Sequence, residues 1–525
     1  MEPVHLLDLI LVLLAVAVAL SVLARSLHIP PAVAFVPGGM LLAITPGVPA
    51  FELDPALVMT LFLPPLIQSA AYFTIWRDFR ANLRPILLLA VGAVAFTTLV
   101  VGGALKLMVP GLPWAACFTL GAIISPPDAV AASAVLEHLR LPRRLVTILE
   151  GESLVNDASG LVLFRFAAAA AMGATFDAVG AGAAFVAVAA GGIAIGYACG
   201  VVLVWLLRRL RDTRLEITAS FLAAWASYLA AESVEASGVL STVACGLVLG
   251  WRQHEVFTSE SRLEARAAWG FVTFVLEALV FVLIGFSLRG VLIRLGVGNA
   301  MLLLPMAIAI TLVAIVARFV WMYPATYLPR LLWPPLKRRD PSPPWTYPTV
   351  LAWSGMRGVV SLAAALALPN GFPGRDTIML VTFVVIFGTV VVQGTTLGPL
   401  IKGLGVAADA PDSDTADEFT ARVAMASASL LVIEAALTDP LMGGVAQDIV
   451  QEYRKRADMI GRSAIGAAAR EERQALLALR LDANAAARTE LLRLHRAGDI
   501  HDFVLSRLEH ELDLEEIRIR RQRGA

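Results

Sequence analysis

The chain has 525 residues, of which 58% are hydrophobic, and its mean hydropathy is +0.75. Soluble domains rarely reach these values, and many windows of about 20 apolar residues are long enough to cross a bilayer. The composition therefore excludes an ordinary soluble domain and predicts an all-α polytopic membrane protein. The net charge of +0 gives no information about partners. No nucleic-acid partner is expected.

Thirteen apolar segments are predicted to span the membrane as helices. No basic segment precedes the first span and no A-x-A cleavage site follows it, so it is predicted to be a helix rather than a cleaved signal. Several boundaries are marked by Pro or Gly. The predicted spans are 5–24, 30–47, 54–73, 85–109, 113–137, 143–172, 179–207, 215–233, 237–251, 267–288, 296–324, 346–369 and 376–402.

Basic residues are distributed unevenly between alternate loops. Cytoplasmic loops carry an excess of Lys and Arg, so the set of loops that is richer in basic residues is predicted to be cytoplasmic. This places the N-terminus outside and the C-terminus inside, as an odd number of helices requires. The richer set holds Arg25, Arg77, Arg80, Arg84, Arg140, Arg143, Arg144, Arg208, Arg209, Arg211, Arg214, Arg252, Arg262, Arg266, Arg330, Lys337, Arg338 and Arg339. The poorer set holds Arg289, Arg294 and Arg375.

The composition changes after the last predicted span. "AADAPDSDTADE" is an acidic linker, and the charged segments after it have helical periodicity, with Leu505, Leu508 and Leu512 on one face. The sequence therefore predicts a transmembrane domain at 1–404 and a cytoplasmic helical tail at 405–525. The tail is interpreted either as a solvated bundle that packs on the membrane domain or its twin, or as a regulatory segment.

Two consecutive prolines, Pro126 and Pro127, precede Asp128 in the fifth predicted helix. They remove two backbone donors and clash with the preceding turn, so the helix is predicted to break there. Broken spanning helices line cavities and often hold coupling ions. Glycines flank Arg357 in the twelfth helix and would permit a similar break. Asp128 is alternatively a cap for the half-helix after the break.

The sixth predicted helix carries two carboxylates inside an apolar run. Ser153 and Asp157 are four residues apart and share one face, while Glu152 and Asn156 share a neighbouring stripe. A hydroxyl and a carboxylate are hard oxygen ligands suited to a small cation such as sodium. The alternatives are structural: Asp157 bonded to helix backbones, and Asn156 tying helices together.

Ionisable groups near the bilayer centre are costly, which makes them candidates for function. If Arg357 pairs with Glu152, Asp128 and Asp157 have no fixed partner. Burial disfavours the charged form of a carboxylate, so such a group binds a proton or a dehydrated metal cation. One site that holds either species in turn exchanges a cation for a proton without a cofactor. Glu277 and Arg318 are also deep.

Three stretches together resemble the monovalent cation:proton antiporter-1 family, the bacterial sodium/proton exchangers related to animal sodium/hydrogen exchangers. They are "SPPDAVAASAVL" at 125–136, "GESLVNDASGLVLF" at 151–164 and "WSGMRGVVSLAAALALP" at 353–369, in the family's order. The resemblance covers about residues 5–402. It implies two inverted repeats, helices 1–6 and 8–13, that form a core domain and a dimerisation domain. The fifth and twelfth helices would be unwound and cross near the ion site.

The resemblance also implies roles for single residues. Asp157 matches the ion- and proton-binding Asp, Asp128 the acid at the helix break, and Ser153 a cation-coordinating hydroxyl. Asn156 would mark the electroneutral branch of the family. Glu152 and Arg357 would form a structural ion pair in the core. Glu277 and Arg318 are predicted to be a possible second buried pair.

The expected activity is electroneutral one-to-one exchange of sodium for protons, for pH and sodium homeostasis, by a homodimer in the lipid bilayer. Potassium or lithium are alternative cations. A gated cation channel is a rival that needs a continuous pore. An intramembrane aspartyl protease using Asp128 and Asp157 is another, but the chain has no GxGD motif.

Two positions depart from the family. Pro127 replaces the Thr of many relatives, so a hydroxyl is missing there, although the backbone carbonyl of Pro127 can still bind an ion. Gln68 and Ser69 occupy the region where some relatives carry Glu, which removes a possible acidic ligand.

Overall fold

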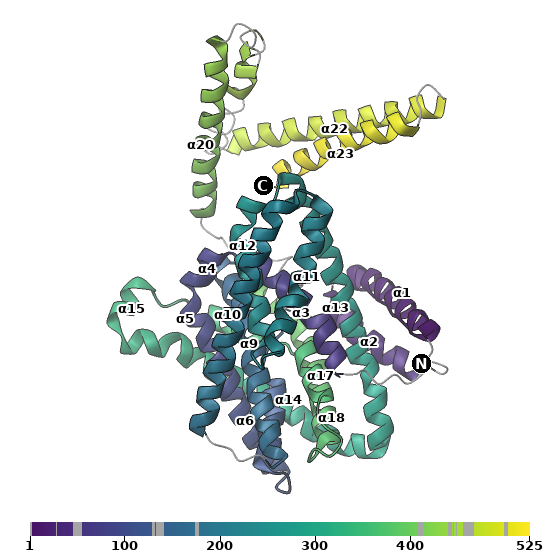
Figure 1. Ribbon diagram of the computed structural model, residues 1–525, viewed down its shortest axis with the longest axis vertical. Helices are drawn as coiled ribbons and strands as arrows, with labels where there is room; N and C mark the ends of the chain where they lie inside the picture. Colours follow the sequence, from purple (N-terminus) through teal and green to yellow (C-terminus); the bar gives the residue numbers. More distant parts are fainter. Residues whose placement is uncertain are drawn as a thin grey trace. The chain divides into compact units, whose positions relative to one another are not determined.

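The computed structural model describes all but a few short stretches of the chain, and every described element is a helix. The chain forms two compact units, Met1–Ala410 and Pro411–Ala525, and each is described here by itself. Figure 1 shows the helices of both. The described residues are 3–27, 29–45, 55–128, 132, 141–173, 178–406, 413–438, 444, 446–447, 449–454, 467–497 and 502–524.

The first half of the membrane unit contains one continuous helix that changes type midway: α5 passes through a π-helical segment, η1, into α6. A π-segment inserts an extra residue into the helical ladder, and such bulges often lie at functional sites. The elements are α1 (Pro3–Leu27), α2 (Pro31–Ile44), α3 (Pro55–Phe73), α4 (Trp76–Ala81), α5 (Leu83–Leu87), η1 (Leu88–Ala93), α6 (Val94–Met108), α7 (Trp114–Ile124) and α9 (Arg143–Ala171).

The second half ends with a similar helix, in which the π-segment η2 joins α18 to α19. The elements are α10 (Ala178–Leu210), α11 (Thr213–Glu232), α12 (Gly238–Val256), α13 (Ser259–Leu295), α14 (Val297–Leu332), α15 (Pro334–Arg339), α16 (Thr346–Trp353), α17 (Val359–Leu366), α18 (Arg375–Gly388), η2 (Thr389–Gln393) and α19 (Gly394–Gly403).

The prediction of an all-helical membrane protein is confirmed. Among the described residues, six helices are long and apolar enough to cross a bilayer: Leu83–Met108, Arg143–Ala171, Gly182–Leu210, Ser259–Leu295, Val297–Leu332 and Arg375–Gly403. Other apolar helices are shorter, and the predicted span 346–369 is divided into α16 and α17. In the predicted span 113–137, α7 ends at Ile124, and most residues after 128 lie outside the described residues. The count of thirteen therefore stays a prediction.

The two halves of the membrane unit pack through crossed pairs: α2 of the first half contacts α13 of the second, and α3 contacts α12. At the α2–α13 contact, a Cβ on Gly39 would lie 2.1 Å from the Val282 carbonyl oxygen, and one on Gly285 would lie 2.1 Å from that of Val36. Small residues let membrane helices approach this closely. The reciprocal contacts agree with the predicted inverted repeats.

The apolar core surrounds the interruptions in α7 and between α16 and α17. One buried cluster joins side chains of α2, α3, α9 and α13 to those of α16 through α19. A second joins α6 and α7 to α14, α17 and α18. The two interruptions therefore lie within packed protein, where irregular backbone is tolerated at membrane depth.

The second unit contains α20 (Ser413–Ala435), η3 (Ala436–Thr438), α22 (Ala467–Ala497) and α23 (Asp502–Gly524). Helices α22 and α23 pack against each other, and Figure 1 shows them as a long hairpin. Arg488 of α22 donates to Asp513 at 2.6 Å and to Glu516 at 3.1 Å, both on α23. The helical character predicted for the tail agrees with these elements.

Candidate functional site

Two interrupted helices cross at the centre of the membrane unit. Helix α7 ends at Ile124, one residue before Ser125 and the two prolines, and the second interruption occupies residues 354–358. The backbone N–H of Asp128 donates to the Met356 carbonyl oxygen at 2.7 Å. This bond joins two segments more than 200 residues apart in sequence. The helix therefore ends at the prolines as predicted, and the irregular segments around Asp128 and Met356 are in contact.

Each interruption presents a charged side chain to the helix end of the other. The Asp128 carboxylate accepts a hydrogen bond from the Val359 N–H at 3.4 Å, at the N-terminus of α17. The Arg357 Nε donates to the Ile124 carbonyl oxygen at 2.5 Å, at the C-terminus of α7. Helix N-termini carry partial positive charge and C-termini partial negative charge. Each charged side chain therefore lies at a helix terminus of opposite partial charge.

Gly358 permits the close approach of Asp128 to α17. A Cβ at this position would lie 1.7 Å from Oδ2 of Asp128, far inside van der Waals contact. Any larger residue would displace the carboxylate or the start of α17. The glycine therefore positions the Asp128 side chain as well as permitting the break.

Arg357 is buried and binds backbone and hydroxyl oxygens. Besides Ile124, its guanidinium donates to the Gly355 carbonyl oxygen, and its backbone N–H donates to Oγ1 of Thr389 at 3.1 Å. Within the described part of the chain it forms no ion pair with a carboxylate. Its role there is to hold the two interruptions and η2 together.

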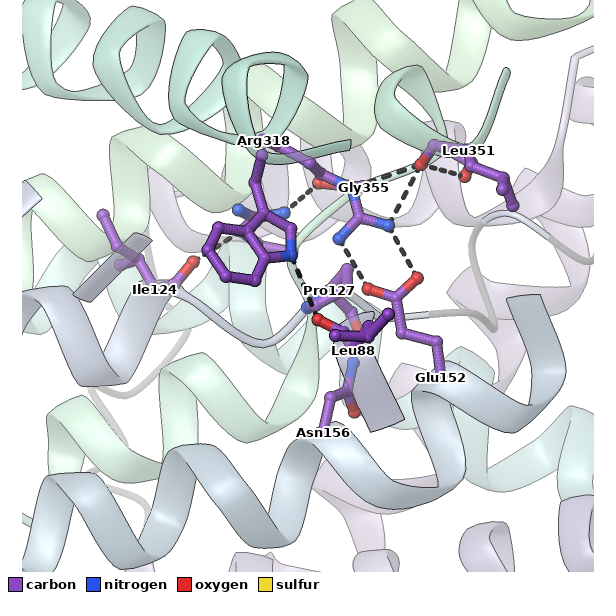
Figure 2. A network of polar contacts seen from close by, with 11 residues as sticks. Leu88, Ile124, Pro127, Glu152, Asn156, Arg318, Leu351 and Gly355 are labelled. Atoms are coloured by element: carbon purple, nitrogen blue, oxygen red, sulfur yellow. Dashed lines mark hydrogen bonds and ion pairs between the residues drawn. The ribbon is translucent and has the colours of Figure 1, made fainter. Parts of the chain in front are cut away.

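Glu152 of α9 pairs with Arg318 of α14. Both guanidinium Nη atoms donate to the carboxylate, at 2.6 and 2.8 Å, and the side chains are 2% and 3% exposed. Arg318 also donates to the Leu351 carbonyl oxygen from Nε and Nη2, at 3.2 and 3.0 Å. Figure 2 shows Glu152 facing Arg318, with Leu351 beside them. This planar, two-bond geometry is the strong form of an ion pair.

Both predicted pairings are therefore wrong. Glu152 does not bind Arg357, because Arg318 occupies its carboxylate and Arg357 is satisfied by carbonyl oxygens. Arg318 does not bind Glu277, because Glu152 and Leu351 take its donors. Glu277 lies on α13 and is partly buried.

Asn156 lies one turn after Glu152 on α9 and is fully buried. Its Nδ2 donates to the Pro127 carbonyl oxygen at 2.6 Å, while its Oδ1 has no hydrogen-bond partner. Figure 2 shows the side chain pointing at the interruption of α7. Asn156 thus ties α9 to the broken segment, and one buried acceptor beside it is unsatisfied.

Asp157 contrasts with these neighbours. Within the described residues it makes no hydrogen bond and no ion pair, although the charge of Asp128 acts on it. Asp157 and Ser153 are partly buried, one turn apart on α9. The arrangement leaves a carboxylate at membrane depth available to a proton or a cation.

Three residues at the site had little sequence signal. Arg318 is predicted from the sequence to lie deep in the membrane. Its partner depends on the rotation of α14 relative to α9, which the hydropathy pattern does not determine. Thr389 accepts from Arg357 in the middle of an apolar run. Thr98 donates to Ser125 at 3.2 Å beside the α7 interruption and was not predicted at all.

Comparisons with known proteins identify the family of this chain. The family described as "Sodium/hydrogen exchanger, transmembrane" matches residues 10–403. This chain belongs to that family. The exchanger is 34% identical to an uncharacterized Na⁺/H⁺ exchanger of Mycobacterium tuberculosis, over 97% of this chain and 95% of the relative. It is 30% identical to a sodium, potassium, lithium and rubidium/H⁺ antiporter of Bacillus pumilus, over 86% of this chain and 70% of the relative.

A solved structure shares the fold of the exchanger. The sodium proton antiporter MjNhaP1 from Methanocaldococcus jannaschii matches with a TM-score of 0.60 and 18% identity, over 77% of this chain and 99% of that one. At this identity the match concerns the fold alone.

Proposed function

We propose that this exchanger moves sodium and protons in opposite directions by alternating occupancy of the Asp157 carboxylate. The observation that carries the proposal is the contrast in partners around the crossing. Glu152 is neutralised by Arg318, and Asp128 faces the N-terminus of α17. Asp157 has neither kind of compensation among the described residues. A buried carboxylate in this position binds a proton or a dehydrated cation.

The sodium ligands in this proposal are oxygens close to the crossing. Asp157 and Ser153 supply a carboxylate and a hydroxyl from one face of α9, and Asp128 supplies a second carboxylate. The Pro127 carbonyl accepts one hydrogen bond from Asn156, and a carbonyl oxygen has two lone pairs, so one remains for an ion. These are hard donors, which suit sodium.

The exchange is proposed to be electroneutral, with one sodium ion for one proton. Asn156 does not titrate, so no second ionisable group stands beside Asp157 on α9. Replacing one Na⁺ by one H⁺ then moves no net charge across the membrane. The two ion gradients alone would set the direction of transport.

Potassium and lithium are the second candidates for the cation. The relative from Bacillus pumilus is named for sodium, potassium, lithium and rubidium. In this chain Pro127 provides no hydroxyl at the break and Gln68 provides no charge on α3, so the site has fewer charged oxygens to enforce selectivity.

The setting is proposed to be the plasma membrane, where a homodimer serves pH and sodium homeostasis. The distribution of basic residues supports an outside N-terminus and a cytoplasmic tail. The Pro411–Ala525 unit would then lie in the cytoplasm.

Everted vesicles loaded with acid and a pH-sensitive dye test this function. Sodium added outside is expected to release the internal protons, and lithium and potassium are compared at equal concentration and several pH values. Vesicles without the exchanger are the control. Clamping the potential with valinomycin and potassium is expected to leave the sodium-driven rate unchanged. Absence of sodium-dependent proton release would contradict exchange, and a strong response to the potential would contradict electroneutrality.

A further inference from the structure

Three arginines from separate helices converge on Asp340, in the segment between α15 and α16. Arg84 of α5 donates to Oδ2 and Arg144 of α9 to Oδ1, each at 2.7 Å. Arg330 of α14 donates to Oδ2 at 2.8 Å and to the Asp340 carbonyl oxygen at 3.1 Å. Three guanidinium groups face one carboxylate, so this cluster carries two uncompensated positive charges.

The cluster also has unused donors. Nη1 of Arg84 is buried and makes no hydrogen bond. Arg144 gives only Nη2 to Asp340 within the described residues, and its side chain is 37% exposed. A buried guanidinium nitrogen without an acceptor is costly, and buried donors in native proteins are nearly always paired. An anionic acceptor would satisfy these donors and offset the excess positive charge of the cluster.

A small pocket adjoins the cluster. All three arginines line it, together with apolar side chains such as Leu88, Met322 and Ile148. A few polar groups in an apolar lining are typical of sites that bind small molecules. The planar arginine fork matches phosphate oxygens in pairs, which favours phosphate over a spherical anion.

We propose that this arginine pocket binds a phosphate group, supplied either by free phosphate or by the headgroup of an anionic phospholipid. A free phosphate dianion would balance both excess charges and the phosphodiester of a phospholipid one of them, and the apolar lining would accommodate the carbon atoms of the lipid. The richer basic loops contribute Arg84, Arg144 and Arg330, so the predicted orientation places the pocket at the cytoplasmic face.

The pocket adjoins the ion pair of the transport core. Leu351 lines the pocket, and its carbonyl oxygen accepts two hydrogen bonds from Arg318. Ile148 lies one turn before Glu152 on α9. Phosphate in the pocket would hold α5, α9, α14 and the Asp340 segment together. We therefore expect bound phosphate to raise the unfolding temperature of the exchanger.

Thermal unfolding of the purified full-length exchanger in detergent tests the site. One series adds inorganic phosphate in place of chloride at constant ionic strength. A second adds phosphatidylglycerol to the micelles in place of phosphatidylcholine at equal mole fraction. A saturable rise of Tm in the first series identifies a free anion, and a rise in the second series alone identifies a lipid headgroup. Either result supports a phosphate site, and no saturable rise in either series overturns it.

Matched arginine variants show whether the rise comes from this pocket. Arg84→Gln removes the unpaired buried donor and is expected to weaken the apparent affinity about tenfold or more, the value of one charge-assisted bond. Arg144→Gln tests the same point at a more exposed position, should the first variant fail to fold. Arg165→Gln is the control, because Arg165 also pairs with a carboxylate, Glu232 at 2.9 Å, but does not line the pocket. Equal titrations of wild type, Arg144→Gln and Arg165→Gln would overturn the proposal.

Discussion

Glu152 and Asp157 lie five residues apart on α9, at membrane depth, and their surroundings differ. Glu152 is 2% exposed at the side chain and receives two hydrogen bonds from Arg318. Asp157 receives none from the described residues. The helix supplies two similar carboxylates, and the neighbouring helices pair one of them with an arginine and leave the other without a hydrogen-bond partner among the described residues.

The same division extends to the residues beside them. Asn156 donates a hydrogen bond to the Pro127 carbonyl oxygen, whereas Ser153 lies on the same face of α9 as Asp157. The stripe of Glu152 and Asn156 therefore connects α9 to α14 and to the α7 interruption. The stripe of Ser153 and Asp157 carries the proposed exchange site. This comparison makes predictions that separate transport from stability.

The largest expected effect is loss of transport in Asp157→Asn. The amide is similar in size but cannot bind a proton and a cation in turn, so sodium-driven proton release should fall to the level of empty vesicles. The unfolding temperature should stay close to that of wild type, because no described residue bonds to this carboxylate. Normal exchange by the variant would show that another group carries the ions.

Glu152→Gln should instead cost stability. Removing one partner of a buried ion pair leaves the other charge uncompensated, which costs about 3–5 kcal/mol. Unfolding in denaturant measures the loss. Glu264→Gln, at an exposed position near the start of α13, is the control and should change stability by no more than about 0.5 kcal/mol.

A double-mutant cycle identifies the partner of Glu152. Combining Glu152→Gln with Arg318→Met should cost less than the sum of the two single changes, because the pair is removed together. A larger coupling between Glu152 and Arg357 would contradict the pairing described here.

Gly358→Ala should lower transport by displacing Asp128. The new Cβ would lie 1.7 Å from the Asp128 carboxylate, so that side chain or the start of α17 must move. We expect a decrease of at least about tenfold in the exchange rate, since misplacing a site group by about 1 Å has effects of this order or larger. Gly371→Ala is the control, because a Cβ there meets nothing within 4 Å.

The smallest expected effect is that of Asn156→Asp. An ionised carboxylate cannot donate to the Pro127 carbonyl, so a buried hydrogen bond at 2.6 Å is lost. We expect a destabilisation of about 1–3 kcal/mol, measured by unfolding above pH 7. An unchanged stability would show that the amide does not hold the α7 interruption.

Much of the fold could be predicted because a bilayer constrains sequence strongly. Apolar runs mark helices such as Arg143–Ala171, and Pro126 with Pro127 marks the end of α7. The division of 346–369 into two helices was also indicated, since glycines surround Arg357. These features depend on neighbouring residues along the chain, which sequence reasoning can evaluate.

The pairing of charges could not be predicted in the same way. Four carboxylates and two arginines were predicted to be deep, but which of them meet depends on helix rotation and depth. Arg318 pairs with Glu152, which lies 166 residues away in the sequence, and Arg357 binds the C-terminus of α7 instead. The convergence of Arg84, Arg144 and Arg330 on Asp340 has the same origin, since each lies on a different helix or loop.

Calorimetric titration of sodium into the purified exchanger at several pH values tests the central claim most directly. If Asp157 binds either H⁺ or Na⁺, acidification should weaken sodium binding, by up to tenfold per pH unit, and each bound sodium should release one proton. Buffers of different ionisation enthalpy count that proton, and Asp157→Asn should abolish both effects. A sodium affinity independent of pH, with no proton released, would contradict the account.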